Sequence, residues 1–136
     1  MTPRGILETV LYAVDLDAAD AFYGDVLGLA RVAREGSRHV FFRCGDQVLL
    51  IFNPVETAKP PSAEALPVPP HGADGPGHVC FRATPDEIAL WRRRLADAGI
   101  AIESDFEWPQ GGHSIYFRDP AGNSVEFAEP RIWGLA

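Results

Sequence analysis

An internal repeat is the feature that most constrains the fold. Residues 5–54 and residues 77–131 carry the same order of hydrophobic patterns. Each segment opens with a run of alternating apolar and polar residues, typical of a half-buried strand, and continues with an amphipathic stretch of helical period. Three further strand-like runs complete each segment, and the last two align as "RHVFFRCGDQVLLIFNP" over "HSIYFRDPAGNSVEFAEP". The repeat predicts an α+β fold of two tandem βαβββ modules.

The ends of the second helix are marked by residues suited to helix caps. In "TPDEIALWRRRLADAG", Thr84 suits the N-cap, Pro85 the first helical position and Gly99 the C-terminal cap. The apolar residues between them recur at helical spacing. A short strand is expected after each helix, at residues 30–35 in the first module and at residues 100–105 in the second.

Residues 55–76 separate the two modules. They are rich in Pro, Ala and Gly and show no periodicity, which predicts a long surface loop without a long helix or strand. The chain of 136 residues is long enough for one sizeable core, so we expect residues 1–136 to form a single domain.

Charge and composition exclude several classes of protein. A net charge of -7 argues against a non-specific nucleic-acid binder, because few cations remain to neutralise phosphates. No apolar run reaches membrane-spanning length, and the N-terminus "MTPRGILETV" lacks the apolar region of a signal peptide. We therefore expect a cytoplasmic protein with no membrane partner. The two cysteines, Cys44 and Cys80, lie in strand-like runs and are expected to be small buried side chains rather than a disulfide.

Overlaying the modules places the chemically interesting residues on one surface. The overlay aligns Glu126 with Leu50, and His78 with Glu8. Because side chains alternate across a strand, Glu8 and His78 fall on the face opposite the apolar residues that pack under the helix. Glu126 lies between two apolar neighbours and therefore points the same way. These three side chains are expected to line one concave surface.

Two carboxylates and one imidazole on a shared surface predict a divalent metal site. Carboxylate oxygen and imidazole nitrogen suit Zn, Mn, Fe, Co or Ni, and three protein ligands leave positions open for water or substrate. The metal would also be the partner that a buried Glu126 requires. Each residue has an alternative explanation: Glu8 as a solvated acid at a strand end, His78 as a hydrogen-bonded histidine beside a loop, and Glu126 in an ion pair with Arg82 or Arg118. No residues are assigned to an organic cofactor.

On the open, concave side of the sheets, His113 and Tyr12 are the candidates for acid–base catalysis, with His71 in the loop as a third. His113 follows "QGG" at the mouth of a strand, where a histidine can titrate near neutral pH. An exposed loop histidine is the alternative explanation for His113. Three aromatic residues supply either an apolar wall for the site or core packing: Phe52, Phe106 and Trp108.

Three blocks of this sequence resemble the vicinal oxygen chelate superfamily. They are "VLYAVDLDAADAFYGDVLGL", "GPGHVCFRA" and "GGHSIYFRDPAGNSVEFAEP". The superfamily includes glyoxalase I, extradiol dioxygenases, fosfomycin-resistance proteins and bleomycin-binding proteins. The resemblance covers nearly the whole chain and implies curled mixed sheets that form a cup-shaped site, with the helices on the outer face.

The same resemblance implies site residues and marks two departures from the family pattern. His78 and Glu126 occupy two ligand positions of the family. Glu8 stands where many members have a histidine, which argues against the His-His-carboxylate triad of ring-cleaving iron dioxygenases. Leu50 stands where glyoxalase I members have a further acid that serves as ligand and base, which argues against isomerisation of a glutathione hemithioacetal.

The expected function is that of a divalent-metal-dependent enzyme. It is of lyase, isomerase or dioxygenase type and acts on a small oxygenated molecule through a metal-stabilised oxyanion. The alternative is a metal-free protein that sequesters a small molecule, as bleomycin-binding relatives do. Small two-module members of the family often form twofold dimers. The resemblance therefore implies a homodimer with shared sites, in which Glu8 comes from one chain and His78 with Glu126 from the other.

Overall fold

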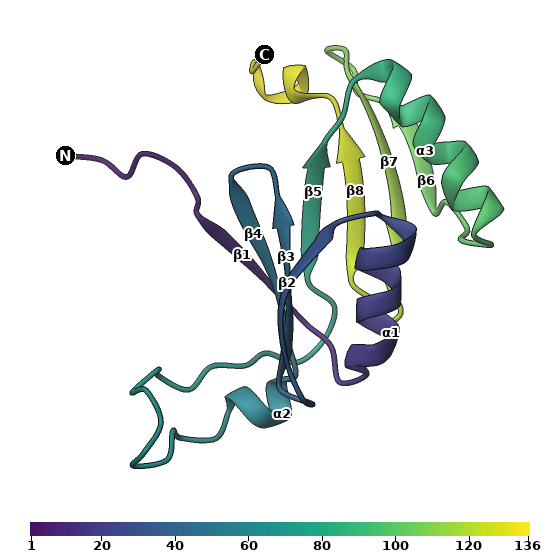
Figure 1. Cartoon of the computed structure of the whole chain (residues 1–136). Helices are drawn as coiled ribbons and strands as arrows, with labels where there is room; N and C mark the ends of the chain where they lie inside the picture. The colour runs from purple at the N-terminus through teal and green to yellow at the C-terminus, as the bar shows by residue number, and fades with distance from the viewer. The chain divides into compact units, whose positions relative to one another are not determined.

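The computed structural model describes all 136 residues and divides them into two compact units, Met1–Gly75 and Pro76–Ala136. Each unit contains one four-stranded mixed sheet and one principal helix (Figure 1). Within each unit the elements follow the order strand, helix and three strands. The α+β fold of two βαβββ modules that the repeat predicts is confirmed.

Unit 1, Met1–Gly75, has the sheet order β1-β4-β3-β2. Its elements in chain order are β1 (Glu8–Tyr12), α1 (Leu16–Asp20) continued by a π-helical segment (Ala21–Val26), β2 (Ala30–Glu35), β3 (His39–Cys44), β4 (Gln47–Phe52) and the short α2 (Pro54–Thr57). The opening strand β1 pairs in parallel with β4, and the other pairs are antiparallel. One edge of the sheet is therefore formed by the opening strand β1.

Unit 2, Pro76–Ala136, repeats this arrangement with the order β5-β8-β7-β6. Its elements are β5 (His78–Arg82), α3 (Pro85–Asp97), β6 (Ser104–Glu107), β7 (His113–Arg118), β8 (Ser124–Ala128) and a terminal 3₁₀ turn (Pro130–Trp133). Again the opening strand, β5, pairs in parallel with the last strand of its sheet and forms an edge. Between α2 and β5 the chain forms no helix or strand.

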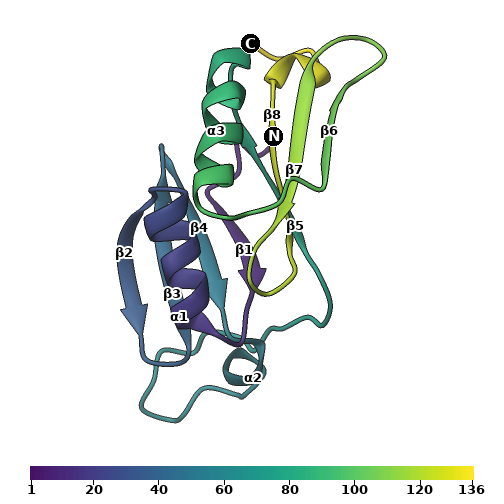
Figure 2. The ribbon, with the colours of Figure 1, turned by 90° about the vertical axis from the view of Figure 1, so that its right-hand side faces the viewer.

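One face of each sheet is covered by a helix, and this face forms the core of the unit. Figure 2 shows α1 lying across the sheet of unit 1 and α3 across that of unit 2. In unit 2, the indole of Trp91 on α3 stacks on Phe127 of β8, with 4.4 Å between ring centroids. The remaining core side chains are almost completely buried, including Leu11, Val40, Phe42, Leu49 and Ile51 in unit 1 and Ile88, Leu95, Ile115, Phe117 and Val125 in unit 2.

The ends of α3 follow the expected capping chemistry. The Thr84 side chain accepts a hydrogen bond from the Glu87 N–H, and the Glu87 carboxylate accepts from the Thr84 N–H, which is a capping box. At the other end Gly99 has φ of +73°, and the Ile100 N–H donates to the Leu95 carbonyl. Because these residues close the helix, the strand expected at residues 100–105 begins later, at Ser104.

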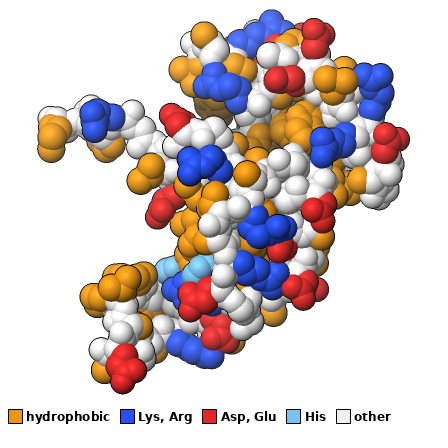
Figure 3. All heavy atoms as spheres, in the orientation of Figure 1, with side chains coloured by type: hydrophobic (Ala, Val, Ile, Leu, Met, Phe, Trp, Pro, Cys, Tyr) orange, Lys and Arg blue, Asp and Glu red, His pale blue; other side chains and the backbone are white.

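None of the helices is both long enough and apolar enough to span a membrane. Over the face drawn in Figure 3, basic and acidic side chains are interspersed, and no large patch of either sign is formed. This surface offers no basic stripe that would follow a nucleic-acid backbone.

Candidate metal site

The candidate site lies on the face of the unit 2 sheet that no helix of that unit covers. Register places Cys80 of β5 and Tyr116 of β7 directly on either side of Glu126 in β8. His78 lies two residues before Cys80 on the same face. Its Nε2 atom is 3.2 Å from Oε2 of Glu126. The structure therefore brings together two of the three residues expected to bind metal.

Glu126 is a buried carboxylate that lacks a full set of partners. The residue is 5% exposed, and its Oε1 atom makes no hydrogen bond. The two arginines considered as partners are engaged elsewhere, Arg118 with Glu103 and Arg82 with the Ala136 carbonyl. A buried charge with an unpaired oxygen costs on the order of 1–3 kcal/mol or more, so the site favours a cation at this position.

The hydrogen bond made by the other nitrogen of His78 determines how the ring can act. Its Nδ1 atom is 3.0 Å from the Ser124 carbonyl oxygen, which can only accept, so Nδ1 carries a proton. In the neutral imidazole, Nε2 then has a lone pair directed at the Glu126 carboxylate. Two electron-rich atoms 3.2 Å apart require a proton or a metal ion between or beside them. A backbone carbonyl bound to the second ring nitrogen is also the usual support of a metal-ligating histidine.

Two neutral groups complete the surroundings of Glu126. Burial and the neighbouring Glu126 carboxylate raise the pKa of the Tyr116 hydroxyl and of the Cys80 thiol, each to about 12. Both groups therefore keep their protons near neutral pH while no metal is bound. Both cysteines are free. The expected burial of Cys80 is wrong, because its strand position places the residue on the open face, where it is exposed as a whole although its thiol lies against Glu126.

Glu8 lies on the corresponding face of unit 1. It is the first residue of β1 and is exposed, and it shares its face with Val10 and Tyr12. Val10 pairs with Leu50, as Cys80 pairs with Glu126, so the equivalence of Leu50 and Glu126 in the overlay is reproduced by the strand register. Within each unit, no group of three or more His, Cys, Asp or Glu side chains is placed to hold a metal.

Tyr12 is hydrogen-bonded to the loop histidine. The Tyr12 hydroxyl lies 2.6 Å from Nδ1 of His71, and the His71 ring packs edge-on against Phe52, with 4.7 Å between centroids. The His71 N–H donates to the Thr57 carbonyl, which attaches the loop to the end of α2. Tyr12 is four residues from Glu8 along β1, a separation of roughly 13 Å for an extended strand.

His113 lies on the helix-covered face of its sheet, opposite to the face that carries Glu126. It is three residues from Tyr116 on β7, and an odd separation reverses the direction of the side chain. Its Nε2 is 2.5 Å from Asp105, which also binds Arg92 of α3, and the Arg92 guanidinium together with His113 holds the pKa of Asp105 at about 2. The expected position of His113 on the open face is therefore not observed.

Sequence reasoning named Phe106 and Trp108 as a possible apolar wall, but it did not single out Tyr116 and Ser114, which lie between Glu126 and these rings. Tyr116 could have been found from the sequence. The Phe-Arg pair shared by both modules aligns their strands, and Tyr116, which precedes this pair in the second module, lies opposite Glu126 and faces the same way. Trp108 reaches this row through its indole N–H, which donates to Ser114 Oγ at 2.8 Å. Phe106 stacks parallel to Tyr116, 5.9 Å between centroids, so the open face carries a row of aromatic rings.

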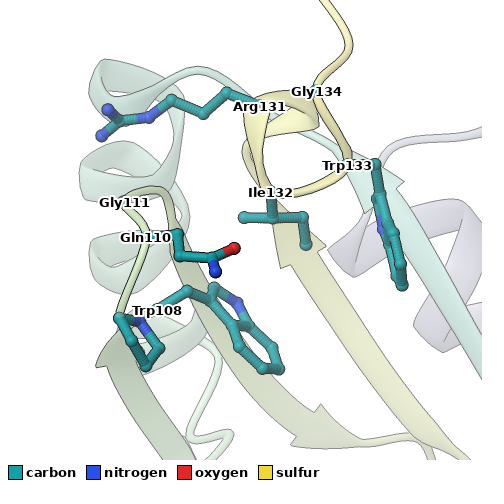
Figure 4. A pocket seen from close by; sticks show the side chains of 8 residues that line it. Trp108, Gln110, Gly111, Arg131, Ile132, Trp133 and Gly134 are labelled. Atoms are coloured by element: carbon teal, nitrogen blue, oxygen red, sulfur yellow. The ribbon is translucent and has the colours of Figure 1, made fainter.

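A separate cavity of about 570 Å³ lies in unit 2, with Trp108 among the side chains that line it (Figure 4). It is lined by residues 108–111 and 131–134 and contains no His, Asp or Glu. Its one cationic side chain, Arg131, binds the Glu129 carboxylate at 2.8 Å. This cavity therefore holds no candidate for metal binding.

The family model for the glyoxalase, bleomycin resistance protein and dioxygenase superfamily matches residues 5–127. The chain belongs to this superfamily. The match covers both units and includes all three residues expected to bind metal. No curated protein matches the chain.

Several solved structures show the same fold over nearly the full length. A lactoylglutathione lyase from Agrobacterium tumefaciens is 48% identical, with a TM-score of 0.92, and the match covers 99% of this chain and 100% of that one. A virulence protein from Salmonella typhimurium is 28% identical over 95% of this chain and 98% of its own, with a TM-score of 0.69. A glyoxalase, bleomycin resistance protein or dioxygenase from Nocardioides is 24% identical, and the match covers 95% of this chain and 85% of that one with a TM-score of 0.72. At this identity the likeness supports the fold alone.

Proposed function

We propose that this glyoxalase-superfamily protein is a divalent-metal-dependent enzyme that acts on a small oxygenated substrate. The observation that carries the proposal is the buried Glu126 carboxylate, with an unpaired Oε1 and the His78 imidazole 3.2 Å from Oε2. Such an arrangement costs free energy in the folded chain unless a cation binds. Proteins retain such destabilising arrangements at functional sites.

The proposed ligands are Glu8, His78 and Glu126. Their oxygen and nitrogen donors suit Zn, Mn, Fe, Co or Ni, and none of them requires a thiolate. When bound, the metal would supply Lewis-acid stabilisation of a substrate oxygen that gains negative charge. The protein's own contribution is to hold Glu126 in a water-poor position and to orient His78 through the Ser124 carbonyl.

A homodimer with shared sites accounts best for the distribution of these ligands. His78 and Glu126 meet in unit 2, whereas Glu8 belongs to unit 1. We infer that Glu8 of one subunit completes the site formed by His78 and Glu126 of the other. Exposed apolar residues support an association through this part of the chain, because Ile6 and Leu7 beside the edge strand β1 are 69% and 72% exposed.

Among the possible reaction types, lyase or isomerase chemistry has the most support. The Agrobacterium protein, 48% identical to this chain, is named a lactoylglutathione lyase. A hemithioacetal of glutathione is therefore the first substrate to test. Leu50 cannot transfer a proton, so the acid–base group must lie elsewhere. We propose that Tyr12, coupled to His71 by the 2.6 Å hydrogen bond, is this acid–base group and acts on a part of the substrate that lies far from Glu8.

A metal-free binding protein is the second candidate. The row of partly exposed rings formed by Phe106, Trp108 and Tyr116 favours it, because aromatic faces bind flat ligands without a metal. Metal analysis of the protein purified without chelator separates the two functions. One divalent ion per chain that is lost on Glu126→Gln supports the enzyme. A metal-free wild-type protein that gains no activity with added Zn²⁺, Mn²⁺ or Ni²⁺ supports the binding protein.

A further inference from the structure

The Glu126 carboxylate is the end of a row of hydrogen-bonding side chains on the open face of unit 2. Tyr116 lies directly across from Glu126 in the antiparallel pair of β7 and β8. Ser114 is two residues earlier on β7, so its side chain is on the same face. Trp108 follows β6 and donates its indole N–H to Ser114 Oγ at 2.8 Å. Three side chains from neighbouring strands therefore lead to one carboxylate.

The donors and acceptors of this row fit in one direction only. The indole N–H of Trp108 can only donate, so Ser114 accepts from it and has its own hydroxyl proton available. The Tyr116 hydroxyl is next to the Glu126 carboxylate in this row, and burial and the carboxylate raise its pKa, whereas Ser114 lowers it. A carboxylate can only accept a hydrogen bond, so a bond between these two groups has the Tyr116 hydroxyl as donor, and the Tyr116 oxygen is then free to accept from Ser114. The row can therefore pass hydrogen bonds only towards Glu126.

The row also fixes the Tyr116 ring from both sides. The ring lies parallel to Phe106, within 5° at 5.9 Å, and nearly parallel to His78, within 21° at 6.2 Å. Ser114 is completely buried, so little room remains for the hydroxyl to turn away. A donor held in this way restricts the carboxylate to one orientation, with Oε1 left without a hydrogen bond.

We propose that Tyr116, oriented by Ser114 and Trp108, is a positioning residue that holds the Glu126 carboxylate for cation binding. This inference rests on the proposed metal-dependent function and adds the side chains that support one ligand. Such supporting hydrogen bonds matter, because loss of an outer-shell partner typically lowers metal affinity by about 10–100-fold. Removal of the Tyr116 hydroxyl should therefore weaken the site without removing any ligand.

Calorimetric titration of the full-length chain with Co²⁺, together with the visible spectrum of bound Co²⁺, tests the proposal. Tyr116→Phe should lower Co²⁺ affinity by about tenfold or more and alter the spectrum, and Ser114→Ala should act in the same direction. Tyr23→Phe, which removes a tyrosine hydroxyl from the core of unit 1, is the matched control and should leave affinity unchanged. Thermal unfolding of each variant measures any general loss of stability separately.

The outcomes distinguish this inference from the function on which it rests. Affinity of Tyr116→Phe and Ser114→Ala within twofold of wild type, with binding still abolished by Glu126→Gln, overturns the role of Tyr116 and leaves the metal site intact. No Co²⁺ binding by the wild-type protein overturns both. If Tyr116→Phe does not fold, Ser114→Ala and Trp108→Phe test the role of Tyr116 instead. Both variants must weaken Co²⁺ binding if these side chains orient Tyr116, and unchanged binding in both overturns the proposal.

Discussion

Leu50 and Glu126 occupy equivalent positions in the two sheets. Leu50 lies opposite Val10 of the opening strand of unit 1, and Glu126 lies opposite Cys80 of the opening strand of unit 2. Both residues are buried. The two modules therefore differ at one central position, where the first has a hydrocarbon side chain and the second has a carboxylate. Because only the carboxylate can bind a metal ion, each pair of modules has one proposed metal site.

Glu126→Gln should stabilise the metal-free protein while removing its response to metal. The amide keeps the shape of the side chain and relieves the cost of a buried charge whose Oε1 has no partner. We expect the free energy of unfolding to rise by about 1 kcal/mol at pH 8. Urea denaturation with excess EDTA measures this. A variant less stable than wild type by a similar amount would show that Glu126 is satisfied without a cation.

Two variants that each lack a ligand should restore metal binding when they are mixed. Glu8→Gln and Glu126→Gln remove ligands from different units, so in a shared-site dimer one site of each heterodimer is intact. After full subunit exchange at equal amounts, about a quarter of the wild-type number of sites should return. Zn²⁺ titration of the mixture measures the recovery. Mixtures that bind no better than the separate variants would show that the site, if present, forms within one chain.

The ion pairs of Asp105 should contribute to stability only above its folded pKa. Arg92 and His113 lower that pKa from 3.8 to about 2. Because the folded value is lower than the unfolded value, the contribution is complete above about pH 4 and is lost as the pH falls towards 2. The pair is partly exposed, so we expect less than about 1 kcal/mol. Asp105→Asn should remove this contribution at pH 6 and have a much smaller effect at pH 2. An equal effect of the substitution at both pH values would exclude an ionic origin.

The capping box of α3 should be worth about 1 kcal/mol of unfolding free energy. Thr84→Ala removes the acceptor of the Glu87 N–H, whereas Thr84→Ser retains it. Urea unfolding of the two variants isolates the hydroxyl, and Co²⁺ affinity should not change in either. Equal stability of the Ala and Ser variants would mean that the cap adds nothing beyond helix propensity.

Period-two alternation was sufficient to predict which face of each opening strand carries Glu8 and His78. The same rule placed Glu126 beside His78, because the registers of β5 and β8 follow the pattern of apolar residues. The cap at Thr84 and the closing Gly99 were readable for a local reason, since both depend on backbone groups within a few residues. These features could be predicted because neighbouring residues determine them.

His113 could not be placed correctly from its flanking residues. The preceding pair of glycines suggested a flexible mouth, but the direction of the side chain depends on counting from Tyr116 along β7, and an odd interval turns His113 towards α3. The strand expected at residues 100–105 moved to Ser104 because Ile100 closes the helix instead. Contacts between distant segments, such as Tyr12 with His71, have no signal in local pattern at all.

The most direct test of the account is the stoichiometry of divalent metal in the purified protein. Elemental analysis of wild-type protein prepared without chelator, followed by Zn²⁺ titration of the stripped protein, measures it. We predict one ion per chain at a site that Glu126→Gln and His78→Ala each abolish. Wild-type protein that contains no metal and shows no saturable binding of Zn²⁺, Mn²⁺, Co²⁺ or Ni²⁺ would contradict the central claim.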